Sequence, residues 1–287
     1  MGMIRIIYTC GSRSVEFSTD TEMYITDIDG LSYNDITINE TELATQAGSS
    51  RDNLRTKPKN ITFEGRIRYT PLKRSTILAA ILPCKMARIR YIDDLAGIDR
   101  YIEGTPSRTP SFSNNPTWQS FQFTFHVFFP YWRDINDTVV SFVSVDSAFM
   151  LPRSFSGTVP WYISRRNSKP LQTIFNNGST DAGFIVRWTA QSDATGPRIT
   201  RVDSQETISF TGLAMRAGDI VEVSTYDDNK YAHLIRDGVT SNIFNAFDDD
   251  ASFWKLAVGY NSVRGGAISG ESGVYCDLIF NNTYVGI

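Results

Sequence analysis

The chain has 287 residues, of which 28 are Lys or Arg and 31 are Asp or Glu, so its formal net charge is -3. This near balance, without a concentrated basic stripe, argues against sequence-specific nucleic-acid binding, because phosphate contacts dominate the affinity of such proteins. Hydrophobic residues make up 41% and aromatic residues 13%, which is too apolar for a disordered chain and favours strands over helices. The length predicts two domains.

The first half of the chain predicts an antiparallel sheet and one short helix. Apolar and polar residues alternate over 61–69 and again over 121–127, a period of two that is typical of half-buried strands. Between them, apolar residues at helical spacing predict a helix over 73–82, with Pro71 in its first turn and Pro83 ending it. This helix is too short to be stable alone, so we expect it to pack on the sheet.

Two polar stretches are longer than the connections of a compact domain need. Residues 39–59 hold mainly Thr, Ser, Gly and alternating charge, and residues 103–117 are rich in Gly, Pro, Ser and Asn. We predict a loop in each case, since loops beyond about 12–15 residues are commonly functional or disordered. Either each stretch is a mobile surface loop, or it becomes ordered against a neighbouring subunit.

The second half predicts a β-sandwich of its own. Alternation over 184–188 and 274–280, with a further strand over 219–225, indicates short half-buried strands. The dipeptides Asn177-Gly178 and Asp237-Gly238 are typical of the turns between such strands.

A boundary between the two domains is predicted just after Trp132. Residues 133–138 are polar and turn-like, and a new series of strand patterns follows them. This gives a first domain of residues 1–135 and a second domain of residues 136–287. The last strand is ambiguous, because a returning C-terminal strand could pair with the first domain.

No catalytic, cofactor-binding or metal-binding residue is predicted. The two histidines, His126 and His233, do not lie in sequences that resemble a nucleophile elbow. The acidic runs Asp227-Asp228 and Asp248-Asp249-Asp250 lack the ligand spacing of a calcium loop. Three widely spaced cysteines favour buried free thiols over disulfides or zinc. We therefore predict that the chain is not an enzyme and uses no cofactor.

The hydropathy pattern predicts no membrane insertion. The longest apolar run, residues 77–82, is far too short to span a bilayer. The N-terminus has no uninterrupted apolar region that would act as an export signal. We expect synthesis in a cytoplasm.

Aromatic residues of the second half are candidates for contact with carbohydrate, because their rings stack on the apolar faces of sugars. Core packing is the alternative role for most of them, since aromatic residues also dominate buried cores. The candidates are Trp161, Tyr162, Tyr226, Tyr231, Trp254 and Tyr260.

Several short motifs follow one another in order along the chain. The first half contains Asp29-Gly30-Leu31, Lys57-Pro58-Lys59-Asn60-Ile61, the helix at 73–82 and Pro130-Tyr131-Trp132. The second half contains Gly218-Asp219, Ser252-Phe253 and Gly259-Tyr260-Asn261. In this order the motifs resemble the distal tail protein family of long-tailed bacteriophages, and the resemblance covers both halves.

The resemblance implies a mostly β protein of two domains. The first would be a ring-forming β-sandwich or split barrel with one short helix, and the second a β-sandwich like a galectin or a carbohydrate-binding module. It implies a homo-hexameric structural hub in the virion, at the tail tip or baseplate, made in the host bacterial cytoplasm. The tail tube protein and the tail-tip hub protein are the implied partners around the DNA channel. A receptor-binding protein and host glycans stay open as further partners.

The stretch 39–59 would then be an arm that crosses to the adjacent subunit. A head-to-tail interface of this kind closes into a ring when its rotation divides a full turn. A carbohydrate-binding adhesin is the alternative function and would use the second domain alone, whereas no residue pattern supports a glycan-cleaving enzyme. The candidate contact residues of the arm are Leu43, Arg51, Leu54, Arg55, Lys57 and Lys59.

Overall fold

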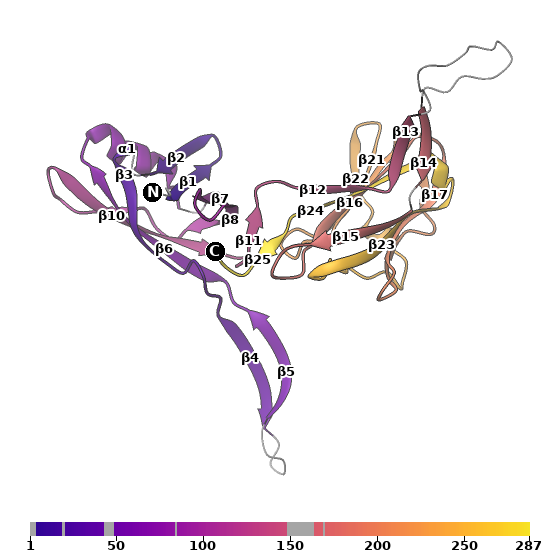
Figure 1. Ribbon diagram of the computed structural model, residues 1–287, viewed down its shortest axis with the longest axis horizontal. Helices are drawn as coiled ribbons and strands as arrows, with labels where there is room; N and C mark the ends of the chain where they lie inside the picture. Colours follow the sequence, from indigo (N-terminus) through magenta and orange to yellow (C-terminus); the bar gives the residue numbers. More distant parts are fainter. Residues whose placement is uncertain (1–3, 19–20, 43–48, 84, 148–163, 169) are drawn as a thin grey trace. The chain divides into compact units, whose positions relative to one another are not determined.

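The computed structural model of the chain describes residues 4–18, 21–42, 49–83, 85–147, 164–168 and 170–287. It divides into two compact units, one made of Met1–Ile135 with Thr283–Ile287 and the other of Asn136–Asn282 (Figure 1). Strands make up nearly all of the regular structure, and α1 is the one α-helix among the described residues. The predicted mostly β fold with one short helix is confirmed.

The first unit is built on a sheet whose strand order is β2-β1-β7-β8-β10-β6-β3. β9 pairs with β10, and β11 pairs with both β8 and β25. A bridge between Ser18 and Met23 links the ends of β2 and β3, the two outer strands of this order. The strands are β1 (Ile4–Cys10), β2 (Arg13–Phe17), β3 (Met23–Asp29), β6 (Lys59–Arg68), β7 (Ala87–Asp93), β8 (Ile98–Pro106), β9 (Ser111–Phe112), β10 (Trp118–Val127), β11 (Trp132–Asp134) and β25 (Thr283–Tyr284).

The centre of this sheet follows the alternation of the sequence. β6 and β10 pair along their whole length, from Trp118 opposite Arg68 to Val127 opposite Lys59. On β10 the apolar residues of the pattern are fully buried, and the ring of Phe123 stacks on that of Phe63 with the centroids 4.9 Å apart. Aromatic pairs of this kind on facing strands add stability beyond their buried area.

The helix α1 (Pro71–Ala80) begins two residues earlier than predicted. Thr70 caps it, since its hydroxyl accepts a hydrogen bond from the amide of Lys73 at 3.2 Å, and Pro71 fills the first helical position. Ile77 and Ala80 are buried, and the helix packs against β1 and β2. The predicted helical end at residue 82 is wrong, because Ile81 already leaves the helical conformation ahead of Pro83.

The second unit is a β-sandwich of two antiparallel sheets. One sheet has the order β12-β24-β16-β20-β21-β22, and the other has the order β15-β23-β17-β18 with β19 beside β17. A core of buried side chains from both sheets, including Trp188 and Val263, lies between them. The strands are β12 (Thr138–Ser141), β15 (Leu171–Asn176), β16 (Phe184–Ala190), β17 (Ala194–Arg201), β18 (Glu206–Ser209), β19 (Ala214–Met215), β20 (Ile220–Ser224), β21 (Tyr231–Arg236), β22 (Val239–Asn242), β23 (Gly259–Ser269) and β24 (Val274–Phe280), with single turns of 3-10 helix at Phe244–Ala246 and Glu271–Gly273.

The Asp237-Gly238 dipeptide forms the predicted turn. It joins β21 directly to β22, and both residues have positive φ, 51° for Asp237 and 77° for Gly238. A two-residue hairpin loop of this kind needs the left-handed conformation, which glycine adopts without strain. The second unit also contains the pair β13 (Val143–Ser147) and β14 (Ser164–Ser168), which form a two-stranded sheet of their own.

The prediction of a loop is wrong for the described part of 39–56 and wrong in part for 103–117. Residues 39–59 lie mostly in a β-hairpin, β4 (Ile36–Glu42) with β5 (Ser49–Thr56). The stretch 103–117 contains the end of β8 and all of β9. The strand residues of both segments satisfy their backbone hydrogen bonds by pairing, which a polar composition does not prevent. Of the cysteines, Cys10 and Cys276 are free and buried, and Cys84 lies outside the described residues.

Candidate assembly surface and aromatic face

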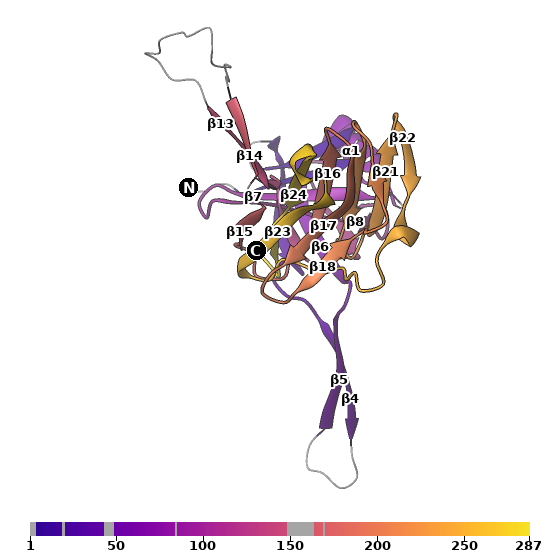
Figure 2. The same cartoon turned by 90° about the vertical axis from the view of Figure 1, so that its right-hand side faces the viewer.

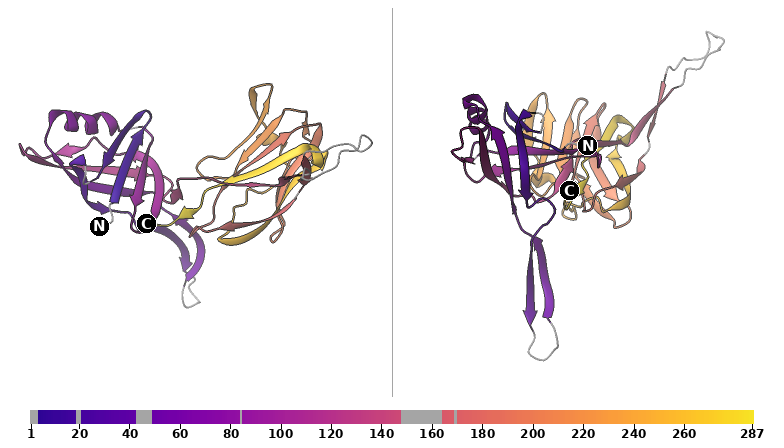
Figure 3. Two further views of the ribbon diagram at one scale, coloured as in Figure 1. Left: turned by 45° about the horizontal axis from the view of Figure 1, so that its top comes forward. Right: turned by 60° about the vertical axis from the view of Figure 1, so that its left-hand side comes forward.

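The β4–β5 hairpin projects from the sheet of the first unit. Its two strands pair with each other and with no other described strand, and Figures 2 and 3 show the pair leaving the rest of the unit. Two apolar side chains on β4, Ile36 and Ile38, are 50% and 57% exposed. Neighbouring isoleucines on one side of a protruding hairpin are unusual in a chain that remains single, because they leave apolar surface in water.

The predicted arm residues do not all belong to this hairpin. In the register of β4 with β5, Arg51 lies opposite Glu40 and Leu54 lies opposite Ile38. Arg55 and Lys57 are exposed at the base of β5. Leu43 lies outside the described residues. The assignment of Lys59 to an exposed arm is wrong, since this residue is only 6% exposed at the start of β6.

The hairpin base, formed by Leu31, Thr56, Lys59, Tyr131 and Trp132, anchors the hairpin to the sheet. The carbonyl oxygen of Leu31 accepts hydrogen bonds from Lys59 Nζ at 3.3 Å and from Trp132 Nε1 at 3.2 Å. The hydroxyls of Thr56 and Tyr131 lie 2.8 Å apart and share a hydrogen bond. Trp132 is fully buried. The hairpin therefore leaves the unit from a rigid, hydrogen-bonded position.

Gly30 brings two of the sequence motifs together at the hairpin base. Its φ is +91°, and a Cβ added to it would lie 2.4 Å from the carbonyl oxygen of Asn60. Only glycine combines this conformation with so close an approach. The motifs at 29–31, 57–61 and 130–132, far apart in the sequence, thus meet at one point, so they encode how the hairpin is held.

Burial of Lys59 lowers the pKa of its ammonium group from the ordinary 10.5 to about 8, because the charged form is poorly solvated there. Between pH 8 and 10.5 the unfolded chain binds more protons than the folded chain at this residue. The contribution of Lys59 to the free energy of unfolding therefore becomes more favourable as the pH rises through this window. Below pH 8 the buried charge lowers the free energy of unfolding by a constant amount.

Replacing Lys59 with methionine should stabilise the first unit. At pH 7 we expect Lys59→Met to raise the free energy of unfolding by about 1–3 kcal/mol, because the buried charge is lost while the alkyl stem is kept. The Leu31 carbonyl would still accept from Trp132 Nε1. Urea unfolding of both proteins at pH 7 and pH 10.5 measures the effect. The advantage of the variant should shrink at pH 10.5, and an equal advantage at both pH values would contradict the buried-charge explanation.

The candidate glycan-contact aromatics lie in different environments. Trp254 is 3% exposed, and its ring lies 4.5 Å from that of Phe184, so its assignment to glycan contact is wrong. Tyr226 and Tyr231 are half-buried, and the Tyr231 hydroxyl donates to Glu222 Oε1 at 2.6 Å. Tyr260, in contrast, is 77% exposed. The other two candidates, Trp161 and Tyr162, lie outside the described residues.

Tyr260 has an aromatic neighbour that sequence reasoning missed. Phe175 lies opposite it across the β15–β23 pair, is 50% exposed, and its ring centroid is 4.8 Å from that of Tyr260. In the sequence Phe175 follows Ile174, which is buried, so it looks like part of a core run. Alternation along 171–175 was the available indication that Phe175 faces the other side from Ile174.

The loop before Tyr260 is held by the fully buried side chain of Asn261. Its Oδ1 accepts from the Ala257 amide at 2.9 Å, and its Nδ2 donates to the carbonyls of Ala257 at 2.7 Å and Gly259 at 3.1 Å. Gly259 has a φ of +91°. The Gly259-Tyr260-Asn261 motif therefore forms a fixed turn that presents the Tyr260 ring to solvent.

The histidines and acidic runs are occupied by local contacts. His126 Nδ1 lies 2.8 Å from Asn60 Oδ1, and the ring of His233 stacks on that of Tyr231. Asp248 accepts from the hydroxyls of Ser209 and Thr211 and from the Thr211 amide, and these hydrogen bonds lower its pKa against the opposing effect of burial. Among the described residues no three side chains of His, Cys, Asp or Glu gather in a way that would hold a metal ion.

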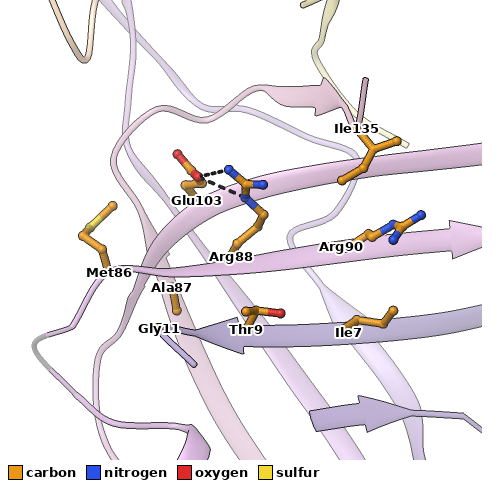
Figure 4. A pocket seen from close by; sticks show the side chains of 9 residues that line it. All are labelled: Ile7, Thr9, Gly11, Met86, Ala87, Arg88, Arg90, Glu103 and Ile135. Carbon is orange, nitrogen blue, oxygen red and sulfur yellow. Dashed lines mark hydrogen bonds and ion pairs between the residues drawn. The ribbon is translucent and has the colours of Figure 1, made fainter. Parts of the chain in front are cut away.

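The first unit has a shallow depression of about 430 Å³ on the outer face of β1, β7 and β8 (Figure 4). Arg88 lines it and donates two hydrogen bonds to Glu103 Oε1, at 2.8 and 3.1 Å. Arg90 forms a paired contact with Asp99 at 2.7 and 2.5 Å, which lowers the pKa of that carboxyl group. Both guanidinium groups are satisfied within the sheet, so they are poorly suited to bind an added anion.

Within the part of the chain that the structure describes, no helix has the length and apolar character needed to cross a membrane. No protein-family model and no curated protein sequence matches the chain.

The fold is similar to that of solved phage proteins. The Dit protein of phage SPP1, described as a paradigm of the hub of the adsorption apparatus in phages that infect Gram-positive bacteria, matches with a TM-score of 0.65 over 97% of this chain and 98% of its own, at 10% identity. The chain has the fold of a distal tail protein. Structures of the phage P2 baseplate in its activated conformation, with Ca and with Sr, match with TM-scores of 0.54 and 0.51 over the full length of both chains, each at 11% identity.

The distal tail protein fold accounts for both units of the chain, since the match with SPP1 Dit spans almost all of each protein. At 10% identity most residues of the two chains differ. The exposed surfaces of this chain must therefore be interpreted from its own residues, among them the exposed isoleucines of the hairpin and the aromatic pair at Tyr260.

Proposed function

We propose that the chain is a structural hub protein of a phage tail tip or baseplate. The observation that carries this proposal is the likeness of fold, over nearly the full length of both chains, to a hub protein of the phage adsorption apparatus. A fold match limited to one unit would be compatible with many functions, whereas a shared order of two dissimilar units is specific to an architecture.

In this proposal six copies close into a ring through the first unit. The β4–β5 hairpin is the arm that contacts the adjacent copy, with Ile36 and Ile38 supplying apolar contact and Arg55 and Lys57 supplying positive charge. Apolar burial stabilises such an interface, because exposed ion pairs contribute only about 0–1 kcal/mol each. A head-to-tail contact of this kind leaves no free interface once the ring closes.

The ring would connect the tail tube protein on one side to the tail-tip hub protein on the other, with the DNA channel through its centre. A receptor-binding protein is a further partner in the virion. The work of such a hub is positional and involves no bond breaking. The local pairing of His126 with Asn60 and of Asp248 with Ser209 and Thr211 is compatible with that role.

The mass of the assembly in solution tests the proposal. Six copies of a 32.3-kDa chain make a particle of about 190 kDa. Light scattering and native mass spectrometry of the purified full chain, alone and with its tail tube protein, should detect this species. A single chain at every concentration, with and without that partner, would contradict the ring.

A polar substitution on the hairpin should weaken the ring without unfolding the chain. We expect Ile38→Ser to raise the concentration at which hexamers dissociate by about tenfold or more, because an isoleucine buried at an interface contributes about 1.5–3 kcal/mol. Sedimentation velocity over a dilution series measures the change. Val239→Ser is the matched control, since Val239 is 68% exposed on β22 in the second unit. Equal dissociation of the two variants would remove Ile38 from the interface.

The adhesin alternative keeps one specific observation in its favour, the exposed ring pair of Tyr260 and Phe175. It does not exclude the hub, because the pair lies in the second unit and the hairpin in the first.

A further inference from the structure

The outer face of the β15-β23-β17 sheet has an ordered arrangement of exposed side chains. Phe175 lies opposite Tyr260, Thr173 lies opposite Ser262, and Leu171 lies opposite Arg264. On the other side of β23, Thr200 lies opposite Arg264 and Arg198 lies opposite Gly266. Figure 1 shows β15 beside β23. Since residues two apart on a strand face the same side, aromatic rings, hydroxyl groups and guanidinium groups follow one another along this face.

One end of the face is an aromatic platform. The rings of Tyr260 and Phe175 are inclined by 50° and are both open to solvent. The turn fixed by Asn261 holds the tyrosine in place. Exposed aromatic rings on a rigid support stack on the apolar face of a sugar at little entropic cost.

The other end is a small polar hollow of about 210 Å³. Gly265 and Gly266 line it, and the carboxylate of Glu271 lies close to Gly266, since a Cβ there would be 2.4 Å from its Oε1. Thr200 and Gln205 also line it. The hollow therefore presents both donors and acceptors, the mixture that sugar hydroxyl groups require.

Two arginines at the hollow carry unused positive charge. Arg198 and Arg264 are exposed and line the hollow, and their side chains form no ion pair or hydrogen bond with any other described residue. They differ in this from Arg88, Arg90, Arg187 and Arg236, each of which is paired with a carboxylate. Glu271 is the one acidic residue lining the hollow, against two arginines. The net charge of the lining is therefore positive and complementary to an anionic group.

We propose that this face binds an acidic oligosaccharide, one sugar ring stacking on Tyr260 and Phe175 and a carboxylate group pairing with Arg198 and Arg264. Tyr260 and Arg264 are four residues apart on one strand, about 13 Å, so a ligand that reaches both ends has more than one sugar ring. The inference does not depend on ring assembly.

The distribution of apolar side chains favours a saccharide over a protein partner. A protein interface has a contiguous apolar core surrounded by a polar rim. Here the hydroxyl groups of Thr173 and Ser262 lie in the middle of the face, and they separate the ring pair from Leu171. A sugar chain alternates apolar ring faces with hydroxyl groups, which this order matches.

The test is binding of a panel of tetrasaccharides to the purified full chain by isothermal titration calorimetry. The panel contains galacturonate, mannuronate, guluronate and hyaluronan tetrasaccharides, each beside a neutral tetrasaccharide of the same length. We expect saturable binding of at least one acidic member and binding about tenfold or more weaker for its neutral counterpart, because charge-assisted hydrogen bonds are lost.

Substitutions then assign the binding to this face. Tyr260→Ala and Arg264→Ala should each weaken it by about tenfold or more, whereas Tyr260→Phe keeps the stacking ring and should retain most of it. Val239→Ser, on the other sheet, should leave it unchanged. The proposal is overturned if no acidic member binds at millimolar concentration, or if binding survives both alanine substitutions. Capture of a baseplate protein that depends on Tyr260, with no saccharide bound, would also overturn it.

Discussion

Shortening the β4–β5 hairpin should convert the proposed hexamer into single chains while both units stay folded. In the register of the two strands, Thr37 and Arg55 lie opposite each other. Replacing Ile38–Leu54 with Asn-Gly would remove the proposed contact residue Ile38 with the outer hairpin and close the remaining strands with a two-residue turn of the kind that suits antiparallel pairs. Most of the arm would be lost, and the hairpin base at Thr56, Lys59 and Trp132 would keep its hydrogen bonds.

The expected effect is large because the interface is repeated at every junction of a ring. Loss of apolar contact at one interface weakens all six junctions of the proposed hexamer, and the assembled state is lost over a narrow range of concentration. Size-exclusion chromatography with light scattering should report the mass of one chain for the shortened protein and about 190 kDa for the parent.

Folding of the shortened protein is checked separately. Far-UV circular dichroism and thermal unfolding should match those of the parent chain in monomeric conditions, since β4 and β5 pair with no other described strand. Insertion of Gly-Gly into the exposed Asp237-Gly238 turn is a control for changes in loop length. Intact rings after the hairpin is shortened would show that the arm is not the ring contact.

The parts of the fold that could be predicted from sequence are those whose pattern is local. β6, β10, β16 and β24 alternate one buried and one exposed face, so a period of two identifies them without knowledge of their partners. The helix α1 has its own cap at Thr70 and its own end before Pro83. In each case the local sequence pattern of the element predicts which of its residues are buried or where it ends.

The β4–β5 hairpin could not be predicted in this way. Ile36 and Ile38 are exposed on one face of β4 and Asn39 is exposed on the other, so apolar and polar residues need not alternate along this strand. Its polar composition therefore looked like a loop, although the two strands satisfy each other's backbone groups.

The environment of Lys59 depends on residues far away in sequence. Its amino group reaches the carbonyl of Leu31, and that carbonyl also accepts from Trp132. A lysine between a proline and an asparagine at the start of a strand gives no local indication of burial, since lysine is rarely buried. Within this motif the side chain of Lys59 supports the hairpin base from inside the unit, whereas Lys57 is exposed.

Trp254 and Tyr260 show the same limit in the second unit. Both belong to short motifs with a glycine or serine nearby, and both were candidates for glycan contact. Only the tertiary structure separates them, because Trp254 packs on Phe184 in the core and Tyr260 points to solvent beside Phe175. Phe175 was missed because its importance comes from the register of β15 with β23, and a sequence pattern does not state which strand is the neighbour.

Replacing Trp254 with alanine should destabilise the second unit and not merely alter a surface. We expect Trp254→Ala to lower the free energy of unfolding of this unit by about 3–5 kcal/mol, because a large ring is removed from a packed core. Trp254 is 3% exposed and packs against Phe184, itself fully buried. Its indole Nε1 has no hydrogen-bond partner among the described residues, so the loss comes from apolar packing.

Tyr260→Ala is the matched control for this prediction, since it removes an aromatic ring that is 77% exposed and should change the free energy of unfolding by less than about 0.5 kcal/mol. Differential scanning calorimetry of the full chain measures both variants, with the transition of the second unit as the readout. Equal stability of the two variants would contradict the core assignment of Trp254. This expected difference in stability also decides how a saccharide-binding experiment is interpreted. Loss of binding in a Trp254 variant would report unfolding of the second unit. Loss of binding in a folded Tyr260 variant would report loss of the binding site.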